Sequence, residues 1–176
     1  MVFKRWSKEE VIKLSKTLLL LSVAIYFTIV VFNNLIDYGT NFEFVKHVLS
    51  MDTTFKDNNL MWRSITSSTA HHIFYWIIIL WELGVAILAW IGTVNCFKIF
   101  NKKKFEKGEK QGIIGIVLGL LLWFLAFMTV GGEWFAMWQS EIWNGQDAAF
   151  RMFAIMGIIL LLFSKKNKKE EQKNDK

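Results

Sequence analysis

The chain has 176 residues, of which 53% are hydrophobic and 20% are charged, and its net charge is +6. The apolar residues gather in long uncharged runs, which excludes an ordinary soluble domain and indicates an integral membrane protein. The positive charges lie in separate clusters at the ends of these runs, which argues against nucleic acid binding, and the lone Cys96 excludes an intrachain disulfide or a Cys-x-x-Cys pair.

Three runs are long enough to cross a bilayer, which takes about 20 apolar residues. They cover residues 17–36, 64–97 and 111–132, and Glu82 is the only formal charge inside the second run. A shorter run over 148–163 is a fourth candidate, which reaches full length if Arg151 extends its side chain toward the membrane surface. We therefore predict transmembrane helices over about 14–35, 71–97, 111–135 and 147–164.

The basic residues predict the orientation of these helices. They cluster before the first helix, between the second and third, and after the fourth, whereas the opposite side holds only Lys46, Lys56, Arg63 and Arg151. The positive-inside rule then places both the N and C termini in the cytoplasm. The predicted fold class is an all-α, integral membrane four-helix bundle over residues 1–164, followed by a charged tail, 165–176, that we expect to be disordered.

The long outer loop, residues 36–70, contains one further helical pattern. Its segment TNFEFVKHVLS places Phe42, Val45 and Leu49 at helical spacing. This pattern predicts a short amphipathic helix that lies on the outer leaflet.

Glu82 shares one face of the second helix with other polar and small residues. At 100° per residue, this face also carries His71, Tyr75, Ile78, Ala86, Ala89 and Thr93. Small residues let helices approach closely, so we expect this face to pack against other helices rather than lipid. The matching faces would be a polar stripe on the first helix and a glycine side on the third, namely Ser15, Ser22, Tyr26, Ile29 and Asn33, and Gly112, Gly115, Gly119 and Ala126.

The depth of Glu82 predicts its partners. Counting from the outer helix ends places it level with Ser22 and Tyr26 of the first helix and Trp123 of the third. No Lys or Arg lies at that level, so burial favours a neutral carboxyl group that donates to Tyr26 or Ser22 and accepts from Trp123. Tyr75 and His71 complete this predicted intramembrane polar site, which either holds helices together or serves as a proton relay, cation site or ligand anchor.

The stretch GGEWFAMWQSEIWNGQDAAFR, residues 131–151, forms a second candidate feature at the outer rim. Its tryptophans fit the aromatic belt at the level of the lipid headgroups, and Asp147 and Arg151 have the spacing of an intrahelical ion pair. The alternative is an outward-facing mouth walled by Glu133, Trp134, Trp138, Gln139 and Arg151, with His71 and His72 at the top of the second helix and Asp147 also on the outer rim.

The histidines do not predict a metal or haem site. His71 and His72 are adjacent, so they point about 100° apart on one helix and cannot both face one metal ion. We therefore predict no metal and no cofactor.

Several long stretches resemble one known family. They are NNLIDYGTNFEFVKHVLSMDTTF, HHIFYWIIILWE and GGEWFAMWQSEIWNGQDAAFR, and they resemble the uncharacterised bacterial family of predicted small integral membrane proteins. The resemblance covers nearly the whole chain outside the charged tail and implies a multi-pass protein of the bacterial inner membrane with four helices. It implies no reaction, ligand or functional residue.

Three functions remain open. The first expectation is a non-enzymatic accessory or scaffolding subunit of a membrane complex, whose partner is a membrane protein or a second copy of the chain within the lipid bilayer. The alternative is a small oligomeric transporter or channel that uses Glu82 as a proton or cation site. A membrane oxidoreductase subunit that binds haem, quinone or copper is the third, and the histidine spacing argues against it.

Overall fold

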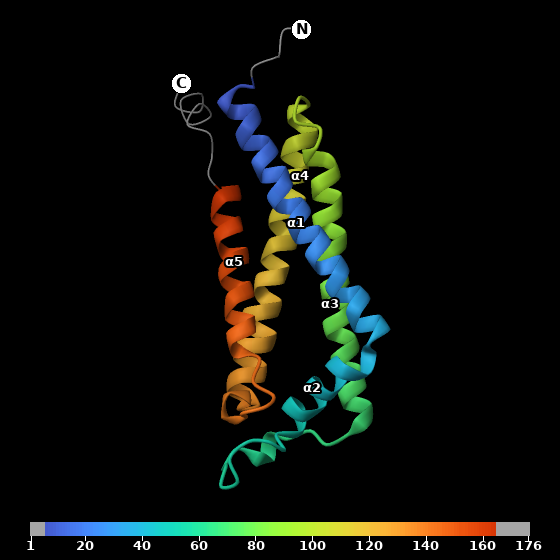
Figure 1. Ribbon diagram of the computed structural model, residues 1–176, viewed down its shortest axis with the longest axis vertical. Helices are drawn as coiled ribbons and strands as arrows, with labels where there is room; N and C mark the ends of the chain where they lie inside the picture. The colour runs from blue at the N-terminus through green and yellow to red at the C-terminus, as the bar shows by residue number, and fades with distance from the viewer. Residues whose placement is uncertain (1–5, 165–176) are drawn as a thin grey trace.

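The computed structural model describes residues 6–164, and the predicted tail at 165–176 lies outside them (Figure 1). The described residues form helices and connecting segments without any strand, which confirms the all-α prediction. Four helical rods are long and apolar enough to cross a membrane: α1 (Lys8–Ile36), α3 (Ser68–Cys96), α4 with its continuation η2 (Lys102–Trp134), and α5 (Gln146–Ser164).

Shorter helices connect these rods at one end of the bundle. They are α2 (Tyr38–Ser50), η1 (Met61–Arg63) and η3 (Met137–Gln139). We call this end the α2 end, and we call the opposite end, where α1 begins, α5 ends and residues 97–101 join α3 to α4, the terminal end (Figure 1). The helix predicted in the outer loop is therefore present as α2.

Local signals explain where the long helices begin. Ser7 and Glu10 form a capping box, in which each side chain bonds the backbone N–H of the other, and Ser67 caps α3. The chain has no proline, so no helix is interrupted by one. These caps place the start of α1 about six residues earlier than the apolar pattern predicts.

Glycines bring α3 and α4 into backbone contact. A Cβ atom added at Gly92 would lie 2.9 Å from the Gly112 nitrogen, and one added at Gly108 would lie 2.7 Å from the Gly92 oxygen. Both distances are too short for any side chain, so this crossing requires glycine. The predicted glycine side of the third helix is thus a packing surface, and Leu20 of α1 also fits against Gly112.

The core has two parts. The part within the spans joins α1, α3, α4 and α5 through residues such as Leu20, Phe27, Val85, Ile116 and Met156. The second part lies at the α2 end, where Val45, Leu49 and Met51 pack with Tyr75 and Met137. α2 therefore has its own apolar core and is not a loosely held surface helix.

The last part of the third rod is a π-helix, η2, over Leu122–Trp134. The Thr129 hydroxyl donates to the carbonyl five residues earlier, at Phe124, and the Phe135 amide donates to Val130. The transmembrane helix predicted over about 111–135 is present as the rod of α4 and η2, but the sequence does not indicate that its second part is a π-helix. π-Helices are rare and usually last a single turn, so a segment of 13 residues is unusual.

Candidate functional site

Glu82 lies on the inward face of α3 and is 2% exposed. Of the other residues predicted to share this face, His71, Tyr75, Ala86, Ala89 and Thr93 are also buried, and Ile78 is partly buried. Trp76, Leu80, Ile87 and Trp90, which the helical spacing places elsewhere, are all exposed. The spacing of small and polar residues therefore predicts the packed face of α3 correctly.

The hydrogen-bond partner of Glu82 is Asn34 of α1. The Asn34 amide nitrogen donates to Glu82 Oε2 at 2.6 Å, and the Asn34 amide oxygen accepts from Asn41 of α2 at 2.6 Å. Tyr75 adds a bond of 3.3 Å from its hydroxyl to the backbone oxygen of Asn34. We call Glu82, Asn34 and Asn41 the carboxyl–amide chain, and it links α3, α1 and α2.

The predicted partners of Glu82 do not take this role. Ser22 is exposed and donates to the Leu18 carbonyl of its own helix at 3.0 Å. The Trp123 indole N–H is buried and has no hydrogen-bond partner within residues 6–164, and Tyr26 packs its ring edge-on against Phe27. These three assignments are wrong as hydrogen-bond partners of Glu82.

The physical reason is an offset between the helices. Counting from the outer helix ends assumes that α1 and α3 begin at the same level. Instead, α1 ends at Ile36 while α3 extends further in the same direction to Ser68 (Figure 1). Asn34, near the end of α1, therefore reaches Glu82 at the middle of α3, and the one signal for it in the sequence is an uncharged amide close to the end of the first apolar run.

Most of the predicted polar stripe of α1 faces away from the bundle, whereas its Tyr26 is half-buried against the core. Ser15, Ser22 and Asn33 are exposed, and so is Ile29. The inward face instead carries Thr17, Leu20, Val23, Ala24, Phe27, Val31 and Asn34. The two serine hydroxyls donate to carbonyls of their own helix, at Val11 and Leu18, so they need no partner inside the bundle.

The three histidines lie in separate places at the α2 end. His71 is buried and donates from Nε2 to the Ile65 carbonyl at 2.7 Å, which ties the loop before α3 to the helix. His72 bonds the Tyr38 hydroxyl at 2.8 Å through Nδ1 and stacks on Phe42. Residues 6–164 contain no group of three or more His, Cys, Asp or Glu side chains that could hold a metal ion.

His47, near the end of α2, lies between two carboxylates. Its Nδ1 donates to Asp52 at 2.8 Å, and its Nε2 lies 3.4 Å from Glu43. The ring also stacks on Trp143 at 4.7 Å between centroids. This contact joins α2 to the segment that precedes α5, and no sequence spacing predicts it because the two residues are far apart in the chain.

The residues of the predicted outer rim take part in separate local contacts and do not line one common opening. The Gln139 side chain accepts bonds from the Phe55 amide at 3.1 Å and from Asn58 at 2.9 Å. Trp134 stacks against the Arg63 guanidinium at 4.5 Å, and Trp138 meets Phe55 edge-on. These contacts hold residues 55–63 against the end of η2 and against η3.

Glu133 and Asp147 line a shallow surface hollow between η2 and α5, with a volume of about 430 Å3. The remaining lining residues are Phe124, Met128, Thr129, Gln146 and Phe150. Among the salt bridges of the described residues there is none between Asp147 and Arg151, so the predicted intrahelical pair is not formed. Both side chains are exposed, and water competes effectively for such pairs.

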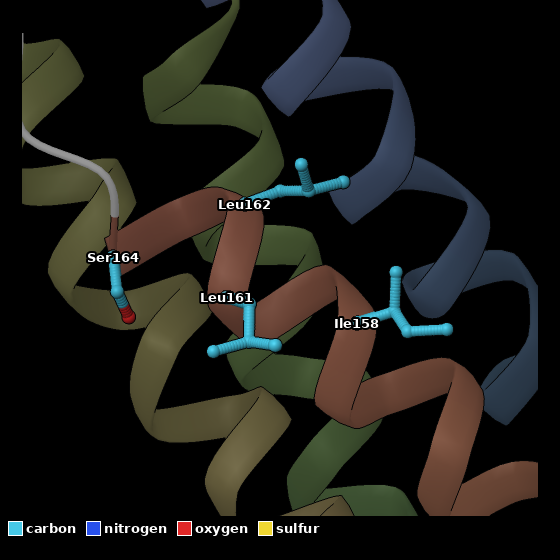
Figure 2. A pocket seen from close by; sticks show the side chains of 4 residues that line it. All are labelled: Ile158, Leu161, Leu162 and Ser164. Carbon is cyan, nitrogen blue, oxygen red and sulfur yellow. The ribbon is translucent and has the colours of Figure 1, made fainter.

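A second hollow, of about 470 Å3, lies on α5 near the terminal end. Figure 2 shows that its lining side chains, Ile158, Leu161, Leu162 and Ser164, all project from α5. The Ser164 hydroxyl is already bonded to the Leu160 carbonyl at 2.9 Å. This apolar surface suits lipid chains and carries no group that would orient a polar ligand.

Comparison with known proteins agrees with this architecture. A family model described as "Predicted small integral membrane protein (DUF2165)" matches residues 12–166. The chain belongs to this family. The match confirms the resemblance predicted from the sequence and identifies an integral membrane protein of unknown function. A search of the curated proteins and a search of the solved structures each find no significant match.

Proposed function

We propose that this family member is a non-enzymatic accessory or scaffolding subunit that packs against a larger protein of the bacterial inner membrane. The observation that supports this role is the outward-facing polar stripe of α1. Tyr26 is half-buried and Asn33 is exposed, and neither side chain has a hydrogen bond within residues 6–164. A polar group that faces hydrocarbon without a partner costs free energy, so a neighbouring helix that bonds it would be favoured.

The basic clusters support the orientation of this subunit. By the positive-inside rule, the terminal end would face the cytoplasm and the α2 end the outside. The outward stripe of α1 would then run through the bilayer from Ser15 at the cytoplasmic side to Asn33 near the outer side.

Native mass spectrometry after gentle purification tests the accessory role. We expect a second polypeptide in fixed ratio to this chain, and we expect the double variant Tyr26→Phe, Asn33→Leu to lose it. Thr129→Val is the matched control, because Thr129 is also polar and exposed in a spanning helix but lies on η2. Recovery of the bare chain from the wild type, or retention of the partner by the double variant, would overturn the proposal.

A second candidate function is transport of a proton or cation through an oligomer. The carboxyl–amide chain favours it, because it leads from the buried Glu82 to Asn41, which is exposed on α2. Glu82→Gln should then abolish flux into vesicles while the protein still inserts. Equal flux in the two forms, or no flux in either, rejects transport.

A further inference from the structure

We propose that Glu82 is a proton-binding site that exchanges with the α2 side of the membrane and is closed toward the terminal side. The proposal rests on the geometry around the carboxyl group and does not depend on the accessory role.

The path toward the α2 end is polar. Glu82 bonds Asn34, and Asn34 bonds Asn41, which lies in the first half of α2 and is exposed. The Tyr75 hydroxyl lies beside this path, bonded to the Asn34 backbone oxygen. Successive polar groups of this kind give water molecules and protons a favourable route to a buried carboxyl group.

The path toward the terminal end is closed by packing. In that direction the face of α3 that carries Glu82 continues through Val85, Ala89 and Gly92, which are all buried. A Cβ atom at Gly115 would lie 3.4 Å from the Ala89 nitrogen, and one at Gly92 would lie 2.9 Å from the Gly112 nitrogen. This contact between two helix backbones leaves no room for a water molecule.

The groups around Glu82 favour a proton over a metal ion. The Asn34 side chain presents its N–H to the carboxyl group, because its oxygen accepts from Asn41. A metal ion would need further electron-pair donors, and the N–H group that Asn34 presents to Glu82 cannot serve as one. A proton needs no further ligand.

The titratable side chains near Glu82 carry no positive charge that could neutralise its carboxylate in place of a proton. They are Tyr26 of α1 and Tyr75 of α3, and Tyr75 in turn lies near Tyr38 of α2 and Asp37 between α1 and α2. Glu82 forms no salt bridge with a Lys, Arg or His side chain among residues 6–164. Its charge is therefore neutralised only by protonation.

The proton on Glu82 would also affect α2. An ionised carboxylate accepts a stronger hydrogen bond than a neutral carboxyl group does. Deprotonation therefore strengthens the bond to Asn34 and holds the amide toward Glu82, which orients its oxygen for Asn41. The position of α2 would therefore change with the proton concentration on its own side of the membrane.

Infrared difference spectroscopy of oriented proteoliposomes tests this site. We expect a carboxyl C=O band that appears when the α2 side is acidified, does not respond to the pH of the terminal side, and is absent from Glu82→Gln. A band that stays constant between about pH 4 and pH 9, or one that follows the pH of the terminal side, overturns the proposal. An equal response to both sides also overturns it and favours the transport candidate instead.

A second measurement covers the case in which Glu82→Gln does not fold. In a Cys96→Ala background, single cysteines at positions 82 and 89 are exposed to a membrane-impermeant thiol reagent. From the α2 side, Glu82→Cys should react at least about tenfold faster than Ala89→Cys, because a thiol at position 89 reacts only after local opening. From the terminal side, neither should react, and a faster reaction at position 89 from either side contradicts the proposed route.

Discussion

The Asn34 amide of α1 donates a hydrogen bond of 2.6 Å to the Glu82 carboxyl group of α3, although 48 positions separate the two residues in the chain. The neighbouring Asn33 points out of the bundle and is exposed. Two adjacent asparagines thus have opposite environments, and the difference allows a direct test of what the buried bond contributes.

Replacing Asn34 by Leu should destabilise the isolated protein. The substitution leaves the Glu82 carboxyl group buried without its partner, which costs about 1–3 kcal/mol. Asn33→Leu is the matched control and should change the free energy of unfolding by less than about 0.5 kcal/mol, because that side chain is exposed. Reversible unfolding in detergent micelles measures both values. Equal effects of the two variants would mean that the Asn34–Glu82 bond contributes nothing specific.

Replacing Gly92 by Ala should also destabilise the protein. The added methyl group would meet the Gly112 nitrogen at 2.9 Å and Leu20 at 2.8 Å, so the helices must separate. Overpacking of this kind costs about 1–3 kcal/mol. Gly84, on the same helix, has nothing within 4 Å of an added Cβ atom, so Gly84→Ala should leave the melting temperature unchanged or raise it. A melting temperature that falls equally in both variants would contradict the close helix crossing.

Lys16 and Glu109 should be coupled more strongly than an exposed pair. The Lys16 ammonium lies 2.7 Å from Glu109 and also donates to the Phe163 carbonyl at 3.1 Å, so it joins α1, α4 and α5. We expect a coupling free energy of about 1–2 kcal/mol from a double-mutant cycle of Lys16→Met and Glu109→Gln. The exposed pair Glu43 and Lys46 should give a smaller coupling, because water screens its charges. A coupling no larger than that of the exposed pair would mean that partial burial does not strengthen the first bridge.

Glu43 should have a pKa below the usual value of a glutamate side chain. The Lys46 ammonium donates a hydrogen bond of 2.8 Å to the Glu43 carboxylate and, with the nearby His47, holds the pKa of that carboxyl group below its usual value. A depressed pKa in the folded state means that this contact contributes stability above the pKa of the unfolded chain, and that the contribution is lost as the pH falls through the folded value. Nuclear magnetic resonance titration of the Glu43 side chain should show a higher midpoint in Lys46→Met. An unchanged midpoint would exclude Lys46 as the cause.

The sequence predicts the spans and the packed face of α3 because single strong signals determine them. A run of about 20 apolar residues has few alternatives to a spanning helix, and one acid among small residues indicates which face is buried. The same reasoning is wrong for α1. Ser15 and Ser22 bond their own backbone, so their polarity does not show whether they face inward.

Other features depend on how the helices lie relative to one another, which cannot be predicted by counting residues along the chain. The Asn34–Glu82 bond follows from the offset between α1 and α3, and the bond to Asn41 follows from the return of the chain through α2. The contact between His47 and Trp143 requires the tertiary fold. The π-helix at Leu122–Trp134 has no sequence signal that we can identify, because its apolar residues suit either type of helix.

The order of Asn34 and Glu82 along the chain has a consequence for biosynthesis. Ribosomes deliver a membrane protein from its N-terminus, so α1 enters the bilayer before α3 does. When α3 enters the bilayer with Glu82, Asn34 of α1, whose amide donates a hydrogen bond to Glu82 in the folded protein, is already in the membrane. We therefore expect the translocon to insert α3 more readily when α1 is intact, and a truncated chain that starts at α3 to place Glu82 in lipid without its partner.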